Sequence, residues 1–162
     1  MTTVTREIGS ALIGILGEIE QAGRPDVSKH TVVDDIVYEL KGSRCHIEIV
    51  VNQKRWLGMK FVLLDENGRP SLSYDIDTDL YDLKQPGNRD FALDIEDEIV
   101  EFLQTLRAGK IRVGELDGRP AMIVPKGTEF CLIKKGRVLT GTSFHKDVGS
   151  LVSKGRFDSL RC

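Results

Sequence analysis

Four aspartates stand close together in the stretch SYDIDTDLYDLKQPGN, and carboxylates at such a density could bind a calcium ion. Asp75, Asp77 and Asp79 have the 1, 3, 5 spacing of the calcium-binding loop of helix–loop–helix proteins. That loop also needs a glycine at its sixth position and a glutamate at its twelfth, where this chain has Leu80 and Pro86. The sequence therefore predicts no metal site in this stretch.

The alternation around these aspartates indicates a β-strand with one face toward solvent, because Leu72, Tyr74 and Ile76 would all point to the other face. On the water side, the predicted sheet would display His46, Glu48, Trp56, Lys60, Asp75 and Asp77. A histidine beside carboxylates can act as a general acid or base, so this face could bind a small molecule or support a modest enzyme activity. A solvated face with scattered ion pairs fits the same pattern, and we favour that interpretation.

Ser143, His145 and Asp147 stand at alternate positions in SFHKD and have the residue types of a catalytic triad. A triad needs a relay of hydrogen bonds, which residues two apart on one strand do not assure. The chain also lacks a nucleophile-elbow glycine pattern and a Walker-type phosphate loop. We therefore interpret SFHKD as a strand end that leads into a helix cap, and we expect no catalytic residue and no cofactor.

Charge is distributed unevenly along the chain. The net charge is -2, but residues 65–101 carry -9 and residues 102–162 carry +7. A helix predicted within the acidic segment would display one acidic stripe without interleaved lysine or arginine: Asp94, Asp97, Glu98 and Glu101. A solvated helix face is the usual interpretation of such a charge run. However, like-charge neighbours cost an isolated helix a few tenths of a kcal/mol each, and a face selected only for stability would tend to include basic residues. Together with Asp79 and Asp82, which precede the helix, the four acidic residues form a candidate surface for a basic protein partner.

Two other classes of partner are not favoured. The basic C-terminal part lacks the interleaving of basic and aromatic residues that is typical of nucleic-acid binding, and the chain as a whole is acidic. Charged residues interrupt the apolar face of the first twenty positions, which argues against a signal peptide and a membrane span.

Two helices are expected to support these candidate sites. The first is predicted from apolar residues at helical spacing and ends at Gly23 and Pro25; its apolar residues are Val4, Ile8, Leu12, Ile15, Leu16 and Ile19. The second should span residues 89–107, with Asn88 at its start and Gly109 after its end. Its buried stripe would consist of Ile95, Ile99, Phe102, Leu103 and Leu106.

Residues 35–79 alternate between apolar and polar side chains, which predicts a four-stranded antiparallel meander. Two-residue turns at Gly42-Ser43 and Asn67-Gly68 would place apolar residues opposite each other, for example Leu40 with Cys45 and Leu63 with Leu72. On the solvent face, the second of these hairpins would place Lys60 opposite Asp75.

Beyond the second helix, turns at Asp117-Gly118 and Lys135-Gly136 predict two more hairpins, with Val113 opposite Met122 and Ile133 opposite Val138. Pro120 and Pro125 lack a backbone donor, which places their strand at an edge or interrupts it. A short helix is expected around Val148, Leu151 and Val152, before Gly155. We expect residues 156–162 to be mobile.

The expected fold is a single α+β domain over residues 1–162. It consists of an antiparallel meander with the N-terminal and central helices on one face, two C-terminal hairpins and a short terminal helix. Cys45, Cys131 and Cys162 are odd in number and include no CxxC pair, so neither a zinc site nor a disulfide framework is expected. A reducing, cytoplasmic compartment follows from this pattern and the missing signal peptide.

Similar orders of helices and strands occur among secretion chaperones, toxin-neutralising immunity proteins and other adaptors, which is an analogy of architecture alone. We expect a non-enzymatic cytoplasmic protein of this adaptor kind, which presents its acidic surface to a basic protein. Six residues form that surface: Asp79, Asp82, Asp94, Asp97, Glu98 and Glu101.

Overall fold

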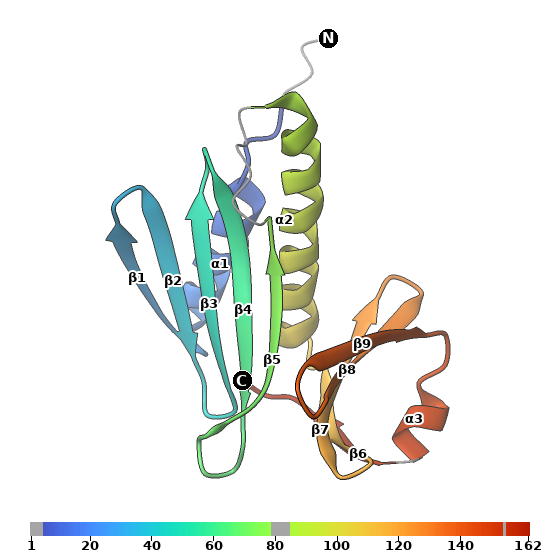
Figure 1. Ribbon diagram of the computed structural model, residues 1–162. Coiled ribbons are helices and arrows are strands. Elements are labelled where there is room, and N and C mark those ends of the chain that lie inside the picture. The colour runs from blue at the N-terminus through green and yellow to red at the C-terminus, as the bar shows by residue number, and fades with distance from the viewer. Residues whose placement is uncertain (1–4, 79–84, 154) are drawn as a thin grey trace. The chain divides into compact units, whose positions relative to one another are not determined.

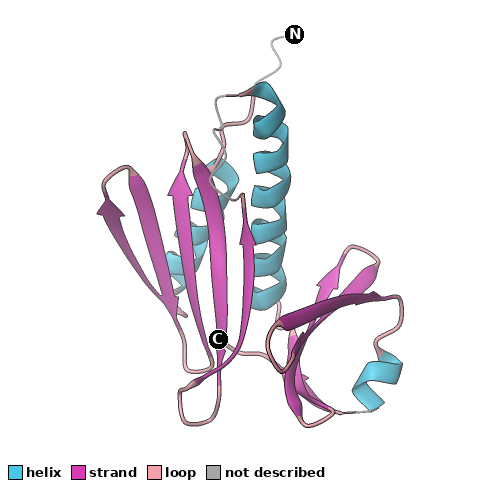
Figure 2. Cartoon of the chain, viewed as in Figure 1, coloured by secondary structure: helices cyan, strands magenta, loops and turns pink. Residues whose placement is uncertain are grey.

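The computed structural model describes residues 5–78, 85–153 and 155–162. These residues form two five-stranded antiparallel sheets and three helices, as Figures 1 and 2 show. The α+β class predicted from the sequence is therefore confirmed. Among the described residues, no helix is long and apolar enough to cross a membrane.

The chain divides into two compact units, and each unit consists of segments that are not consecutive in the sequence. One unit comprises Met1–Gly42, Ile47–Lys60 and Asp75–Val100, and the other comprises Ser43–His46, Phe61–Tyr74 and Glu101–Cys162. The expectation that residues 1–162 form a single domain stays a prediction.

The first sheet has the strand order β1-β2-β3-β4-β5. Its strands are β1 (Asp26–Val32), β2 (Asp35–Lys41), β3 (Cys45–Asn52), β4 (Trp56–Leu64) and β5 (Pro70–Asp77). The predicted meander is thus present, but the sheet has one further edge strand. The sequence did not predict β1 because six of its seven residues are exposed, so its side chains show no alternation that could be recognised.

Two helices, α1 (Ser10–Ala22) and α2 (Pro86–Arg107), lie along one face of this sheet, as expected (Figure 1). The predicted face of α1 is buried at Leu12, Ile15, Leu16 and Ile19. The Phe102 ring on α2 contacts the Phe61 ring on β4, with centroids 5.3 Å apart, and also the Tyr74 ring on β5 at 5.9 Å. Of the stripe predicted for α2, only Ile95 is not fully buried.

The turn between β4 and β5 is one residue longer than predicted. The Asp65 N–H donates to the Arg69 carbonyl at 2.8 Å, and the Gly68 N–H donates to the Asp65 carbonyl at 3.0 Å. Glu66, Asn67 and Gly68 therefore form a three-residue loop, and Gly68 takes the left-handed conformation that this loop requires, with φ of 76°. The Asp65 carboxylate stabilises the longer turn because it accepts hydrogen bonds from the Asn67 and Arg69 N–H groups.

The second sheet has the strand order β10-β6-β7-β8-β9. Its strands are β6 (Arg112–Leu116), β7 (Arg119–Lys126), β8 (Glu129–Lys135), β9 (Thr140–His145) and β10 (Arg156–Ser159). The predicted pairing of Val113 with Met122 is confirmed. The short helix expected after β9 is α3 (Gly149–Ser153), and its Leu151 packs into a buried cluster on this sheet.

Two predictions for this sheet are wrong. Ile133 pairs with Thr142, not with Val138, because residues 136–139 form the loop and the Gly136 N–H donates to the Leu139 carbonyl at 3.0 Å. The strand with Pro120 and Pro125 is the central one and not an edge. Each proline lies one residue from an end of β7, so the ladder loses a donor only near the strand ends.

The expectation of a mobile C-terminal segment is also wrong. β10 pairs with β6, where Phe157 lies opposite Gly114, and the side chain of Leu160 is buried. Cys162 forms a disulfide with Cys45, and their Cα atoms are 5.3 Å apart. This corrects the expectation of no disulfide, and it removes the cysteine pattern as an argument for a reducing compartment.

Candidate functional site

The acidic stripe predicted for α2 is present on this helix. Asp94 and Asp97 are exposed, whereas Glu98 and Glu101 are half-buried. Their spacing places all four on one side of the helix. Asp79 and Asp82, the other two residues of the predicted surface, lie outside the described residues.

Part of this stripe already has partners within the protein. An Asp97 carboxylate oxygen accepts a hydrogen bond from the Arg6 guanidinium at 2.6 Å. Glu101 accepts one from the Gly127 N–H at 3.2 Å. The Arg6 cation offsets the charge of Asp97, and the Gly127 N–H occupies an oxygen of Glu101. The exposed carboxylate of Asp94 therefore becomes the centre of the candidate surface.

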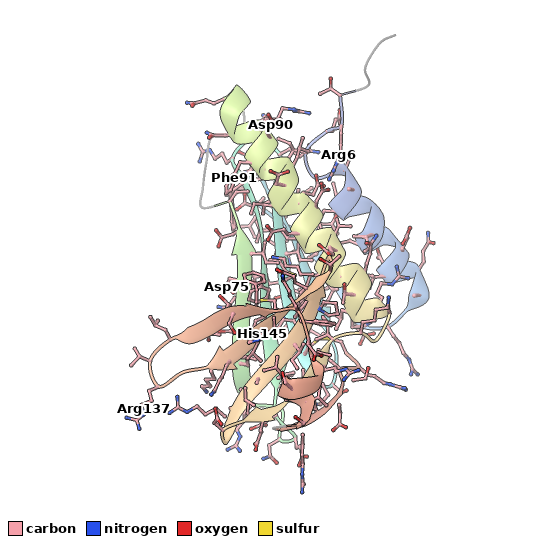
Figure 3. The ribbon with its side chains drawn as sticks, turned by 90° about the vertical axis from the view of Figure 1, so that its right-hand side faces the viewer. Arg6, Asp75, Asp90, Phe91, Arg137 and His145 are labelled. Atoms are coloured by element: carbon pink, nitrogen blue, oxygen red, sulfur yellow. A yellow bond between two sulfur atoms is a disulfide. The ribbon has the colours of Figure 1, made fainter. Side chains whose placement is uncertain are left out.

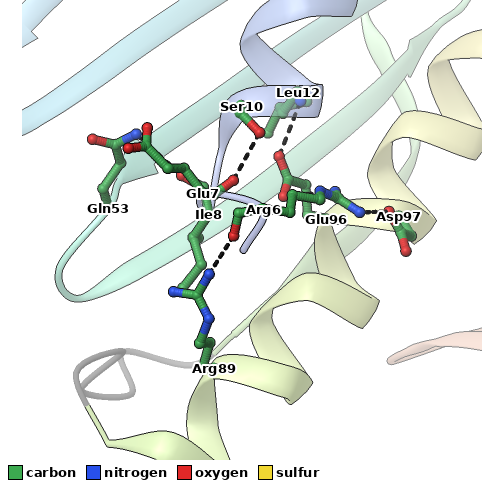
Figure 4. A network of polar contacts seen from close by, with 9 residues as sticks. All are labelled: Arg6, Glu7, Ile8, Ser10, Leu12, Gln53, Arg89, Glu96 and Asp97. Carbon is green, nitrogen blue, oxygen red and sulfur yellow. Dashed lines mark hydrogen bonds and ion pairs between the residues drawn. The ribbon is translucent and has the colours of Figure 1, made fainter. Parts of the chain in front are cut away.

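A network of polar contacts below this surface joins the start of α1 to α2 (Figure 4). Glu96 is fully buried on α2. One of its carboxylate oxygens accepts a hydrogen bond from the Leu12 N–H at 3.0 Å, and the other accepts one from Arg6 at 2.7 Å. The Arg89 guanidinium donates to the Arg6 carbonyl and ties the first turns of α2 to the same segment.

Glu96 acts as a helix cap supplied from a distant part of the chain. The residue before α1 is Gly9, whose side chain cannot accept a hydrogen bond from the first turn. The Glu96 carboxylate takes this role at the positive end of the α1 dipole. Glu96 is not among the residues predicted from the sequence. Two signals pointed to it: a carboxylate next to the buried stripe of α2, and a glycine instead of a capping side chain before α1.

The charge of Arg6 is well stabilised in this network. Partial burial alone would lower the pKa of Arg6, but the hydrogen bond to Asp97 and the charges of Glu96 and Asp97 outweigh this effect. The pKa of Arg6 therefore lies above its usual value, and Arg6 remains a cation that neutralises part of the acidic stripe.

An exposed aromatic residue flanks the acidic stripe. The side chain of Phe91 is 42% exposed on the N-terminal part of α2, next to Asp90, as Figure 3 shows. Asp90 and Asp94 are both exposed, and Asp94 lies one helical turn beyond Phe91. The spacing of Phe91 from Ile95 is that of a buried helix residue, so the exposure of Phe91 was not predicted. We name Asp90, Phe91, Asp94 and Asp97 the α2 patch.

The alternative ligand face is only partly open. His46, Glu48 and Trp56 are half-buried, and Lys60, Asp75 and Asp77 are exposed. The Trp56 ring covers Gly58 beside Asp77, since a Cβ atom on Gly58 would lie 3.1 Å from the ring and 2.9 Å from the Asp77 Cβ. The Nε2 atom of His46 is buried and has no hydrogen-bond partner among the described residues. The predicted pairing of Lys60 with Asp75 stays a prediction.

The possible triad in SFHKD is incomplete. Ser143 Oγ and His145 Nε2 share a hydrogen bond of 2.8 Å on the exposed strand β9. Asp147, however, accepts a hydrogen bond from the Gly149 N–H at the start of α3. This arrangement is the helix cap that the sequence predicts. Among the described residues, no group of histidine, cysteine, aspartate or glutamate side chains could hold a metal ion.

The second unit contains a pocket of about 490 Å³ that the sequence did not predict. Charged side chains of both signs line it, including Arg44, Asp65, Glu115, Asp158 and Arg161. Arg44 and Arg161 directly precede the two cysteines of the disulfide, which therefore helps to hold this wall of the pocket in place.

Comparisons with known proteins assign this chain to no family. No protein-family model, no curated protein and no solved structure matches it.

Proposed function

We propose that this protein is a non-enzymatic, adaptor-like binding protein whose α2 patch docks a protein with a basic surface. The observation that carries this proposal is the exposed Phe91 beside the exposed carboxylates of Asp90 and Asp94. An aromatic side chain beside charges of one sign provides both an apolar anchor and electrostatic selection.

The polar network supports this role because it keeps the patch rigid. Glu96 and Arg89 fix the first half of α2 against the segment that begins α1, so little conformational entropy is lost at the patch when a partner binds. The charges of Asp90 and Asp94 would accelerate encounter with a basic partner, and salt would weaken this effect.

The cytoplasmic location is also a proposal. The Cys45–Cys162 disulfide speaks against it, since disulfides are rare in reducing compartments. A protein-binding role is compatible with either compartment.

A capture experiment with matched variants tests the α2 patch. The tagged protein and its Asp94→Lys, Phe91→Ala and Glu20→Lys variants are used to capture proteins from a lysate, and the captured proteins are quantified. Glu20 is exposed on α1, so its substitution changes the charge equally but lies outside the patch. Asp97 and Glu101 remain unchanged because both have partners within the protein.

A true partner is lost with Asp94→Lys and with Phe91→Ala but retained with Glu20→Lys. With that partner purified, we expect each patch substitution to weaken binding about tenfold, or about 1.4 kcal/mol. We also expect Asp94→Lys to reduce the salt dependence of the affinity. If every captured protein is retained by both patch variants, the proposal is wrong.

Small-molecule binding is the second candidate, and the pocket in the second unit favours it. Its volume of about 490 Å³ is in the range of ligand sites, and its mixture of arginines and carboxylates suits a small zwitterionic compound. A thermal-shift screen with amino acids and related zwitterions tests this, with Arg161→Ala as the control variant. A ligand should raise Tm for the parent protein and not for the variant. No shift at millimolar concentrations would exclude this candidate.

A further inference from the structure

The strand β9 forms an open edge of the second sheet. It pairs with β8 alone in the strand order, and Thr140 to Phe144 are all exposed. Sheet edges are normally protected by charges, prolines, bulges or covering segments. The strand itself, TGTSFH, contains no lysine, arginine, acidic residue or proline. Its backbone therefore remains available to another extended chain.

The pairing with β8 identifies which backbone groups are available. The register that pairs Ile133 with Thr142 also places Leu139 opposite Gly136, and the Gly136 N–H donates to the Leu139 carbonyl. The N–H and C=O groups of Leu139 therefore face β8. Backbone groups alternate in direction along a strand. The residues that also face β8 are therefore Gly141, Ser143 and His145. The residues whose N–H and C=O groups face the open edge are Thr140, Thr142 and Phe144.

The surroundings of this edge are basic and partly apolar. Residues 130–146 contain four lysines and arginines and no acidic residue, and one of the four, Lys134, is paired with Asp117. Lys135, Arg137 and Lys146 are exposed at the two ends of β9, and the side chain of Arg137 extends away from the ribbon in Figure 3. Exposed apolar groups are also available, since Val138 and Leu139 are 91% and 79% exposed in the β8–β9 loop.

We propose that β9 docks an extended acidic segment of a partner protein, which joins the second sheet as an additional strand. The open N–H and C=O groups would bind its backbone, and the flanking cations would bind its carboxylates. A second copy of this chain fits less well. In an antiparallel β9–β9 pair, the end with Lys135 and Arg137 would face the end with Lys146, so like charges would meet. This inference does not depend on the α2 patch.

The first test measures peptide binding by fluorescence anisotropy. The probe is a fluorescein-labelled twelve-residue peptide in which aspartate alternates with valine and threonine, and its matched control carries lysine in place of aspartate. We expect the acidic probe to bind and the basic control to bind at least about tenfold more weakly. Arg137→Glu should weaken binding of the acidic probe and reduce its salt dependence, whereas Asp94→Lys on α2 should not weaken it.

The second test distinguishes strand addition from simple charge attraction. Hydrogen exchange is measured amide by amide, with and without the acidic probe. The amides that face β8, at Gly141, Ser143 and His145, should be protected in both states. The amides of Thr140, Thr142 and Phe144 should exchange rapidly in the free protein and become protected only with the probe.

Two proline variants provide a matched pair for this test. Thr142→Pro removes a donor from the open edge and leaves the β8 ladder intact, so it should abolish peptide binding with a small change in Tm. Ser143→Pro removes a donor to β8 and should lower Tm strongly. Peptide binding by Thr142→Pro at the parent affinity would show that the edge is not used.

Three other outcomes overturn the proposal. The first is equal binding of the acidic and basic peptides. The second is binding to phosphatidylserine vesicles in the absence of peptide binding, which would assign the basic and apolar loop to a lipid surface. The third is a concentration-dependent dimer that Thr142→Pro disrupts, which would assign the edge to a second copy of this chain.

Discussion

The capping of α1 by a residue of α2 leads to a quantitative prediction for Glu96. In Glu96→Ala, the Leu12 N–H loses its acceptor and Arg6 loses its buried partner. Loss of a helix cap costs about 1 kcal/mol, and loss of one partner of a buried ion pair costs about 3–5 kcal/mol. The Arg6 side chain is 35% exposed, so water can solvate part of its charge and the second figure must be reduced. We therefore expect a total loss of about 2–4 kcal/mol in the free energy of unfolding.

The assay is urea unfolding at pH 7, followed by far-ultraviolet circular dichroism. Glu96→Gln keeps an oxygen acceptor for Leu12 but loses the charge that faces Arg6, so it should cost about 1–2 kcal/mol. Asp97→Asn is the control, because the Asp97 side chain is 61% exposed and its ion pair should contribute less than about 1 kcal/mol. The reasoning is refuted if Glu96→Ala costs no more than Asp97→Asn.

Three further predictions concern other parts of the chain. Backbone hydrogen bonds from Arg69 and Asn67 hold the pKa of Asp65 below its usual value, so its stabilising contribution is complete above about pH 4 and is lost as pH falls through the folded-state pKa. Asp65→Asn should therefore reduce the loss of stability on acidification, as thermal unfolding at several pH values would show. Burial raises the pKa of Cys131, so the folded protein should react slowly with thiol reagents, and the unfolded, unreduced protein should expose one thiol. Gly114→Ala should destabilise the protein by about 1–3 kcal/mol in urea, because its Cβ would lie 1.6 Å from the Arg156 carbonyl oxygen and would displace β10.

Local patterns predicted the elements that bury one face. The apolar spacing in α1 and the alternation in β3 and β4 are visible in the sequence because each buried residue leaves a periodic signal. β1 and β10 show no such signal, since almost all of their side chains are exposed. The turn at Asn67-Gly68 was placed correctly but given the wrong length, because Asp65 forms hydrogen bonds that a dipeptide rule does not consider.

Features that join distant residues could not be predicted from local patterns. One partner of Glu96 is the backbone N–H of Leu12, a group that nearly every residue carries, so the sequence does not single it out. Cys45 and Cys162 are 117 positions apart. Cys45 alternates with apolar residues as any buried strand residue would, so this pattern does not reveal the disulfide. The exposure of Phe91 likewise depends on tertiary packing, because its spacing in the sequence resembles that of a core residue.

The distant cap of α1 also has a consequence for biosynthesis. α1 leaves the ribosome before α2, but the carboxylate that completes its first turn lies on α2, 84 positions after Leu12. Until α2 emerges, the apolar face of α1 can pack only against a growing sheet that lacks its second helix. α1 therefore completes its native contacts only after α2 has been synthesised.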